Sequence, residues 1–100
     1  MPRLTKQEAQ KLLDNVLEQY MFYCNDGRLI QSMRDLQNAL LNMADDTFWY
    51  HSNQEKNDFS NWIRDVIGDV KLARDLDKAK DRFQAQSVVA ARIAFLEGKI

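Results

Sequence analysis

The chain has 100 residues with 14 basic and 15 acidic side chains, and its formal net charge of -1 at pH 7 argues against a protein whose main affinity is for nucleic-acid phosphates. Apolar residues make up 45% and charged residues 29%, which is ordinary for a globular protein and excludes a disordered chain. Three glycines and one proline are few for a fold with many tight turns, so the composition favours helices. We expect one domain over residues 1–100, since a second core would have too little chain to bury itself.

Nothing in the chain suggests export or membrane insertion. The single Cys24 cannot form an internal disulfide, and residues 1–20 contain acidic side chains and no apolar run of secretory length. No stretch approaches the roughly 18 apolar residues of a membrane span. We therefore expect a reducing, cytoplasmic location and no membrane partner.

The N-terminal segment has the pattern of an amphipathic helix. Thr5 and Glu8 can form a capping box, in which the hydroxyl caps a free backbone N–H and the carboxylate reaches back. Apolar residues then recur at steps of three and four, at Ala9, Leu12, Leu13, Val16, Leu17, Tyr20 and Met21. This spacing predicts a helix of about four turns.

The segment "FYCNDGRLI" breaks this periodicity. Asp26 and Gly27 can form a two-residue turn with positive φ, and aromatic and branched residues flank them. We expect a short hairpin that pairs residues 21–24 with residues 28–31. The alternative is an irregular loop between helices, closed by Gly27.

The rest of the chain predicts further short helices. Ser32 with Asp35 can open one in the same capping manner, Asp69 and Asp81 are candidate caps, and two more helices are expected to start at Asp45 or Asp46 and around Asn57 or Asp58. Apolar stripes at helical spacing follow the caps, at 33–43, 59–67, 72–79 and 85–100, and a short helix is expected to end at His51. Gly68 suits the left-handed position that ends a helix. We expect a mainly α-helical fold, a compact bundle of five or six short helices.

The aromatic run before the only histidine is the most unusual segment. Successive helical residues point about 100° apart, so Phe48, Trp49 and Tyr50 cannot share one face. One interpretation is an aromatic central layer whose polar edges are satisfied locally. The other is an aromatic-rimmed pocket or interface, with His51 and Asp58 as polar anchors and with Asn57 and Trp62 beside them.

Metal or catalytic chemistry finds little support in the sequence. One His and one Cys cannot make a structural zinc site, and the oxygens of residues 53–57 fail the calcium-loop pattern because Asp58 and Arg64 stand where Gly and Glu are needed. Cys24 has no basic neighbours in sequence to lower its pKa toward that of a nucleophile paired with His51. His51 and Asp58 could form an oriented base, but no candidate nucleophile accompanies them. We expect no catalytic residue, no cofactor and no metal.

A basic stripe follows the Gly68 turn. Lys71, Arg74 and Lys78 are spaced i, i+3, i+7, with Arg82 just beyond, and acidic residues at 75, 77 and 81 interleave with them. Such a run is typical of a solvated helix face with local ion pairs. The alternative is contact with an acidic partner or with nucleic acid.

The central part of the chain resembles a family of small archaeal and bacterial domains of unknown function. The similarity covers residues 22–76 and rests on a series of short motifs: Asp26-Gly27-Arg28, Leu36 and Leu40, Tyr50-His51, Asn57-Asp58-Phe59, Trp62-Ile63 and Val66-Ile67-Gly68-Asp69. Longer members have more residues between the His and the Asn-Asp-Phe motif than the five found here at 52–56. The resemblance implies one compact prokaryotic domain and carries no reaction or ligand.

We expect a non-enzymatic interaction or regulatory module whose partner is a protein or a second copy. A core of this size does not cover both the N-terminal stripe and a last helix that is apolar over more than one face, at Val88, Val89, Ile93, Phe95 and Leu96. We therefore predict a homodimer through the first helix, the 48–50 segment, or both. A monomer whose terminal helices pack together is the competing outcome. The alternative functions are a small-molecule-binding or minor enzymatic domain around His51 and Asp58, and a nucleic-acid-associated factor that uses the basic stripe.

Overall fold

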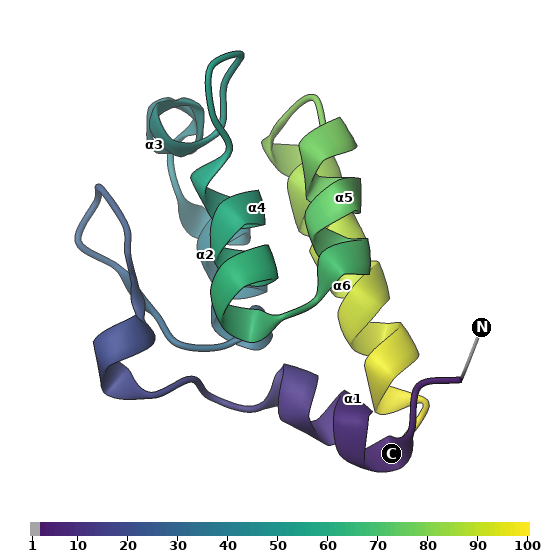
Figure 1. Ribbon diagram of the computed structural model, residues 1–100. Helices are drawn as coiled ribbons and strands as arrows, with labels where there is room; N and C mark the ends of the chain where they lie inside the picture. The colour runs from purple at the N-terminus through teal and green to yellow at the C-terminus, as the bar shows by residue number, and fades with distance from the viewer. Residues whose placement is uncertain (1–2) are drawn as a thin grey trace.

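A computed structural model describes residues 3–100, and in it six α-helices and one two-stranded hairpin form a compact, mainly α-helical fold (Figure 1). The helices are α1 (Lys6–Leu13), α2 (Met33–Asn42), α3 (Asp45–His51), α4 (Asp58–Trp62), α5 (Val70–Lys78) and α6 (Arg82–Glu97). The structure also contains two single-turn segments, η1 (Glu18–Tyr20) and η2 (Ile63–Ile67). The hairpin strands are β1 (Phe22–Tyr23) and β2 (Leu29–Ile30). The predicted fold class is confirmed. None of the helices within residues 3–100 has the length and apolar character that a bilayer crossing requires.

The first helix is half as long as the sequence predicted. The Thr5–Glu8 capping box is present, but α1 ends at Leu13 and the backbone of Asp14 is extended, with φ -73° and ψ 162°. The Asp14 carboxylate accepts the Asn15 N–H, the kind of local bond by which Asp and Asn compete with helix. Val16 then pairs with Gln31: its N–H donates to the Gln31 carbonyl at 2.8 Å, and its carbonyl accepts from Gln31 Nε2 at 2.8 Å. These long-range bonds replace the helix that periodicity alone indicated.

The hairpin is confirmed, but its turn is not the predicted one. Phe22 pairs with Ile30 and Tyr23 with Leu29 in antiparallel register. The Cys24 N–H donates to the Arg28 carbonyl and the Gly27 N–H to the Cys24 carbonyl, both at 2.9 Å, so the loop has three residues. Gly27 supplies the predicted positive φ, at 94°, but Asp26 does not, and a three-residue loop replaces the predicted two-residue turn.

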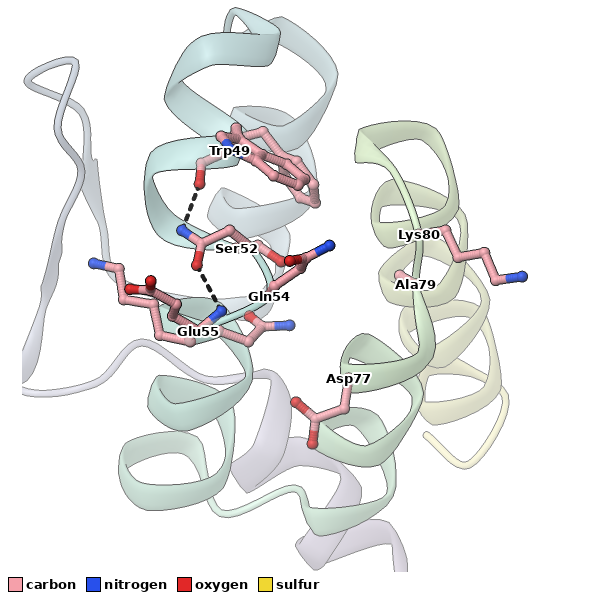
Figure 2. A pocket seen from close by; sticks show the side chains of 11 residues that line it. Trp49, Ser52, Gln54, Glu55, Asp77, Ala79 and Lys80 are labelled. Atoms are coloured by element: carbon pink, nitrogen blue, oxygen red, sulfur yellow. Dashed lines mark hydrogen bonds between the residues drawn. The ribbon is translucent and has the colours of Figure 1, made fainter.

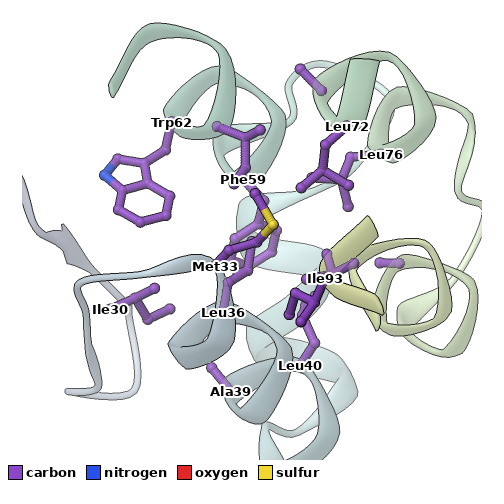
Figure 3. Packing of buried hydrophobic residues seen from close by; sticks show 14 of the residues in the cluster. Ile30, Met33, Leu36, Ala39, Leu40, Phe59, Trp62, Leu72, Leu76 and Ile93 are labelled. Carbon is purple, nitrogen blue, oxygen red and sulfur yellow. The ribbon is translucent and has the colours of Figure 1, made fainter. Parts of the chain in front are cut away.

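Helix α2 lies at the centre of the fold and packs along α6. Its N-cap is Ser32, whose hydroxyl accepts the Asp35 N–H at 3.1 Å, as predicted. The predicted apolar stripe of this helix is buried, with Met33, Leu36, Ala39, Leu40 and Met43 in one core cluster (Figure 3). The α1 helix also packs on α6, which covers Ala9 and Leu13. The first and last helices of the chain are therefore in contact.

The segment from 57 to 68 begins and ends where the sequence indicated. The Asn57 side chain accepts the Ser60 N–H at 3.0 Å, and Gly68 ends the helical run with φ 90°. The last turn is wider than an α-helix, because the Gly68 N–H donates to the Ile63 carbonyl at 2.7 Å and the Asp69 N–H donates to the same carbonyl. This π-type turn was not predicted.

Asp69 fixes α5 against α6. One carboxylate oxygen caps the Leu72 N–H, and the two oxygens accept from Arg92 Nε at 2.7 Å and Nη2 at 3.1 Å. The Asp69 side chain is buried and that of Arg92 is largely buried. The two therefore form a bidentate ion pair inside the fold. Asp81 caps α6 through the Gln84 N–H, as predicted.

Candidate functional site

The three aromatic residues of α3 point in different directions, as their spacing required. Phe48 is buried and stacks on Phe59 with a centroid distance of 5.9 Å. Trp49 is 58% exposed and Tyr50 is 53% exposed. The segment therefore contributes one ring to the core and two to the surface.

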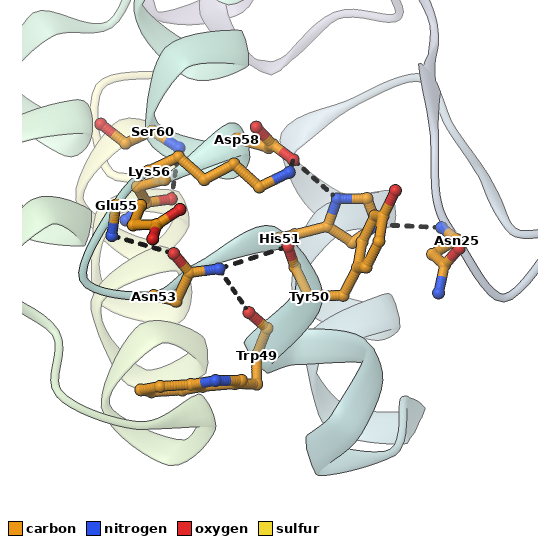
Figure 4. Close-up of polar contacts among 10 residues, drawn as sticks. Asn25, Trp49, Tyr50, His51, Asn53, Glu55, Lys56, Asp58 and Ser60 are labelled. Carbon is orange, nitrogen blue, oxygen red and sulfur yellow. Dashed lines mark hydrogen bonds and ion pairs between the residues drawn. The ribbon is translucent and has the colours of Figure 1, made fainter.

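His51 joins α3 to α4 and to the hairpin loop (Figure 4). Its Nε2 accepts the Asn25 backbone N–H at 2.9 Å, and its Nδ1 lies 3.0 Å from the Asp58 carboxylate. A backbone amide can only donate, so the proton of the ring is on Nδ1 and the imidazole is neutral. The ring also packs against Phe22 and Phe59.

Asp58 carries two donors on one carboxylate oxygen. Lys56 Nζ lies at 2.9 Å and His51 Nδ1 at 3.0 Å from Oδ2. Burial alone would raise the pKa of Asp58, but the hydrogen bonds from Lys56 and His51 and the charge of Lys56 outweigh it and lower the pKa. The predicted His51 and Asp58 pair is thus in contact, in a partly buried polar cluster.

This cluster is arranged for support rather than for proton transfer. Both ring nitrogens of His51 are engaged, and the ring is only 4% exposed, so no nitrogen faces a substrate site. Burial raises the pKa of the Cys24 thiol, which makes its thiolate scarcer. Trp62, another predicted site residue, is buried, and its Nε1–H donates to the Tyr20 carbonyl at 2.8 Å. Among residues 3–100, no group of three His, Cys, Asp or Glu side chains is placed to hold a metal ion.

A hollow beside Trp49 lies near the predicted site (Figure 2). It measures about 450 Å³ and lies between the 52–57 loop and the connection from α5 to α6. His51, Asp58 and Trp62 do not line it. The side-chain amide of Asn53 donates to the Trp49 carbonyl and accepts from the Glu55 N–H. That of Asn57 donates to the Leu76 carbonyl and accepts from the Ser60 N–H. The Asn53 and Asn57 amides of this wall therefore hold the loop together.

The four residues of the basic stripe have different roles. Lys71, Arg74 and Lys78 are exposed on α5, and Lys71 pairs with Asp75 at 2.6 Å. Arg82 is largely covered; its Nε pairs with Asp45, and its Nη1 donates to the Leu40 carbonyl at 2.8 Å. Arg82 is thus a structural residue that closes the end of α2, and only the other three form a solvated stripe.

The outward side of α6 forms a surface whose extent was not predicted from the sequence. Six residues there are exposed, and we call them the α6 face: Phe83, Gln84, Ser87, Ala91, Ala94 and Phe95. Phe83 is 70% exposed and Phe95 is 48% exposed, whereas the buried side of α6 carries Ala85, Val89, Ile93 and Leu96. A helix that is apolar on both sides is normally covered on both sides.

The α6 face carries no charge of its own. Between Phe83 and Phe95 the one charged residue is Arg92, and Asp69 neutralises it. The Arg82 guanidinium lies 5.1 Å over the Phe83 ring and that of Arg92 lies 5.1 Å over the Phe95 ring, which holds both rings in place. The scarcity of charged residues in "FQAQSVVAARIAF", residues 83–95, is the signal in the sequence that could have identified this surface.

Two hollows run along the groove between α5 and the α6 face. One, of about 470 Å³, lies beside Phe83 and is lined by Lys78, Ala79 and Ser87, among others. The second, of about 300 Å³, lies beside Phe95 and Ala91. Asp75 and Val88 line both hollows, so the two hollows adjoin each other near the middle of α6.

The chain matches no family model, no curated protein and no solved structure.

Proposed function

We propose that the chain is a non-enzymatic interaction module that self-associates, with the α6 face as its interface and a second copy as its partner. The observation that carries the proposal is this exposed, uncharged helix surface, which spans Phe83 to Phe95. An exposed apolar patch of this kind is often functional on a folded protein. Because α1 packs on α6, the first helix is a weaker candidate for the interface than the sequence indicated.

The size of the face supports a weak dimer. From Phe83 to Phe95, α6 runs about 18 Å, and the α6 face together with the neighbouring side of α5 is about 20 Å wide. This is roughly 360 Å² in projection, and the relief of the side chains raises the area toward the roughly 500 Å² per copy at the lower limit of specific interfaces. We therefore expect a dimer that dissociates on dilution.

We also propose a prokaryotic origin and a cytoplasmic location. The motifs in residues 22–76 that resemble the small prokaryotic domains support the origin. The unpaired, buried Cys24 supports a reducing compartment.

Light scattering across a concentration series tests the proposed self-association. We expect the mass to rise from the monomer value of 11.7 kDa toward twice that value in the micromolar to millimolar range. Phe83→Glu should keep the chain monomeric, because it places a charge in the interface while leaving the first turn of α6 with a favourable acidic residue.

Tyr23→Glu is the matched control, since it replaces another exposed aromatic ring, on the hairpin at the other side of the fold from α6 (Figure 1). It should dimerise like the parent. A mass that stays at 11.7 kDa at the highest concentration contradicts self-association. A parent dimer that Phe83→Glu leaves intact contradicts the choice of interface.

A further inference from the structure

The α6 face has a near-symmetric sequence. Its centre is Val89; the two phenylalanines stand six residues before and after it, and the small residues Ser87 and Ala91 stand two residues before and after it. All four outer positions are exposed, while Val89 itself is buried. In a two-fold interface, residue i of one copy contacts residue j of the other and j contacts i. In an antiparallel pair centred on Val89, the phenylalanines therefore stand opposite phenylalanines and the small residues opposite small residues.

We propose that two copies pair through antiparallel α6 helices, so that Phe95 of each copy packs into the hollow beside Phe83 of the other. This arrangement rests on the self-association proposed above. Ser87 of one copy then lies opposite Ala91 of the other at the crossing point. Their small side chains let the helix axes approach to the short end of the usual 8–10 Å range.

The hollows between α5 and α6 have room for the incoming rings. A cavity of about 150 Å³ is enough to bind benzene. The hollow beside Phe83 measures about 470 Å³ and the one beside Phe95 about 300 Å³, although both open to solvent. By the two-fold relation, the Phe95 ring of each copy fills the hollow beside Phe83 of the other.

The charges at the rim are compatible with this pairing. Asp75 lines both hollows and so lies near the two-fold axis, with Lys71 toward the Phe95 end and Lys78 toward the Phe83 end. The antiparallel relation places the two Asp75 carboxylates between the four lysines of the two copies. No unpaired charge is buried under the crossing, because Arg92 is already bound to Asp69 within each copy.

Disulfide trapping tests the direction of the helices. The variants Gln84→Cys and Ala94→Cys, each made with Cys24→Ala, are mixed in equal amounts and oxidised, and the linked species are identified by mass. In the antiparallel pair, residue 84 faces residue 94 of the other copy, while the two residues at position 84 are about 15 Å apart along the helix. A disulfide needs Cα atoms within about 7 Å, so the mixed 84–94 species should exceed either like-with-like species by about tenfold or more.

Each outcome of the trapping decides a different point. Predominant 84–84 and 94–94 species, with a dimer mass in light scattering, overturn the antiparallel arrangement and leave self-association standing. A dimer mass with no linked species overturns the α6 interface as well. A monomer mass overturns the proposed function. Gln84→Cys mixed with Tyr23→Cys, also made with Cys24→Ala, is the control, because Tyr23 is exposed on the hairpin, and it should give no linked species above the background of chance collisions.

Discussion

Trp62 and Trp49 show how differently two residues of the same type are used. Trp62 is 7% exposed, donates to the Tyr20 carbonyl and meets the Phe22 ring edge-on, whereas Trp49 is 58% exposed. The indole of Trp62 therefore links α4 to the segment before the hairpin. The indole of Trp49 has no comparable structural role.

We expect Trp62→Ala to lower the free energy of unfolding by about 3–5 kcal/mol, because it removes a large buried side chain and leaves a cavity. The matched control is Trp49→Ala, for which a change within about 0.5 kcal/mol is expected at an exposed site. Chemical denaturation followed by circular dichroism measures both. A Trp62→Ala variant as stable as Trp49→Ala would contradict the role of Trp62 in the core.

Acid stability depends on Asp58. Its pKa is lowered in the folded protein, so its ionised form stabilises the fold above the unfolded pKa near 3.8, and this contribution is lost as the pH falls through the folded pKa. The difference in the free energy of unfolding between the parent and Asp58→Asn should therefore be largest above about pH 5. It should shrink in more acidic solution.

Thermal or denaturant unfolding from pH 7 down to pH 3 measures this margin. Lys56→Gln is a graded comparison, because it removes one of the two donors to Oδ2 and keeps the one from His51. Its loss of stability should be smaller than that of Asp58→Asn. A margin between the parent and Asp58→Asn that does not vary with pH would show that the carboxylate makes no ionic contribution.

At the scale of the elements, most helix starts followed from local chemistry, and the length of α1 did not. Thr5, Ser32, Asn57, Asp69 and Asp81 each cap a helix through a backbone N–H two or three residues ahead in the helix. The stripe beyond Leu13 has the right period for a helix. Its backbone is held by Gln31 instead, a residue on the far side of the hairpin.

The basic stripe of α5 provides a prediction at this scale. The triple change of Lys71, Arg74 and Lys78 to Gln should alter stability by only a few tenths of a kcal/mol per site, since these side chains are exposed. Arg82→Gln should cost about 1–3 kcal/mol, because it leaves the Leu40 carbonyl and the Asp45 carboxylate without their donor. Denaturant unfolding compares the two variants.

The same triple variant tests the nucleic-acid alternative. We expect no tight binding of the parent to a labelled DNA or RNA oligonucleotide in fluorescence anisotropy. Binding that weakens steeply with salt and disappears in the triple variant would favour that alternative over a solvated stripe.

At the scale of the whole molecule, the helices share one buried cluster, and α2 and α6 are its central pair. The hairpin lies on the opposite side of the fold from α5 and α6 (Figure 1). His51 ties the hairpin loop to α3 and α4, and the Asp69–Arg92 pair ties α5 to α6. This arrangement leaves the α6 face uncovered, and we propose that a second copy covers it.

The helical class, the caps, the hairpin and the buried stripes of α2 and α4 could be read from the sequence, because each depends on residues within a few positions of one another. The contact of His51 with Asp58 was also within reach, since seven residues separate them. Other features depend on contacts between distant segments: the end of α1 on residues 15 apart, the bond of the Asn25 amide to His51 on residues 26 apart, and the role of Arg82 on residues about 40 apart. The exposed side of α6 also depends on distant segments, because a helix with two apolar sides does not specify which side the core will cover. Only the packing of α1, α2 and α5 around α6 selects the buried side.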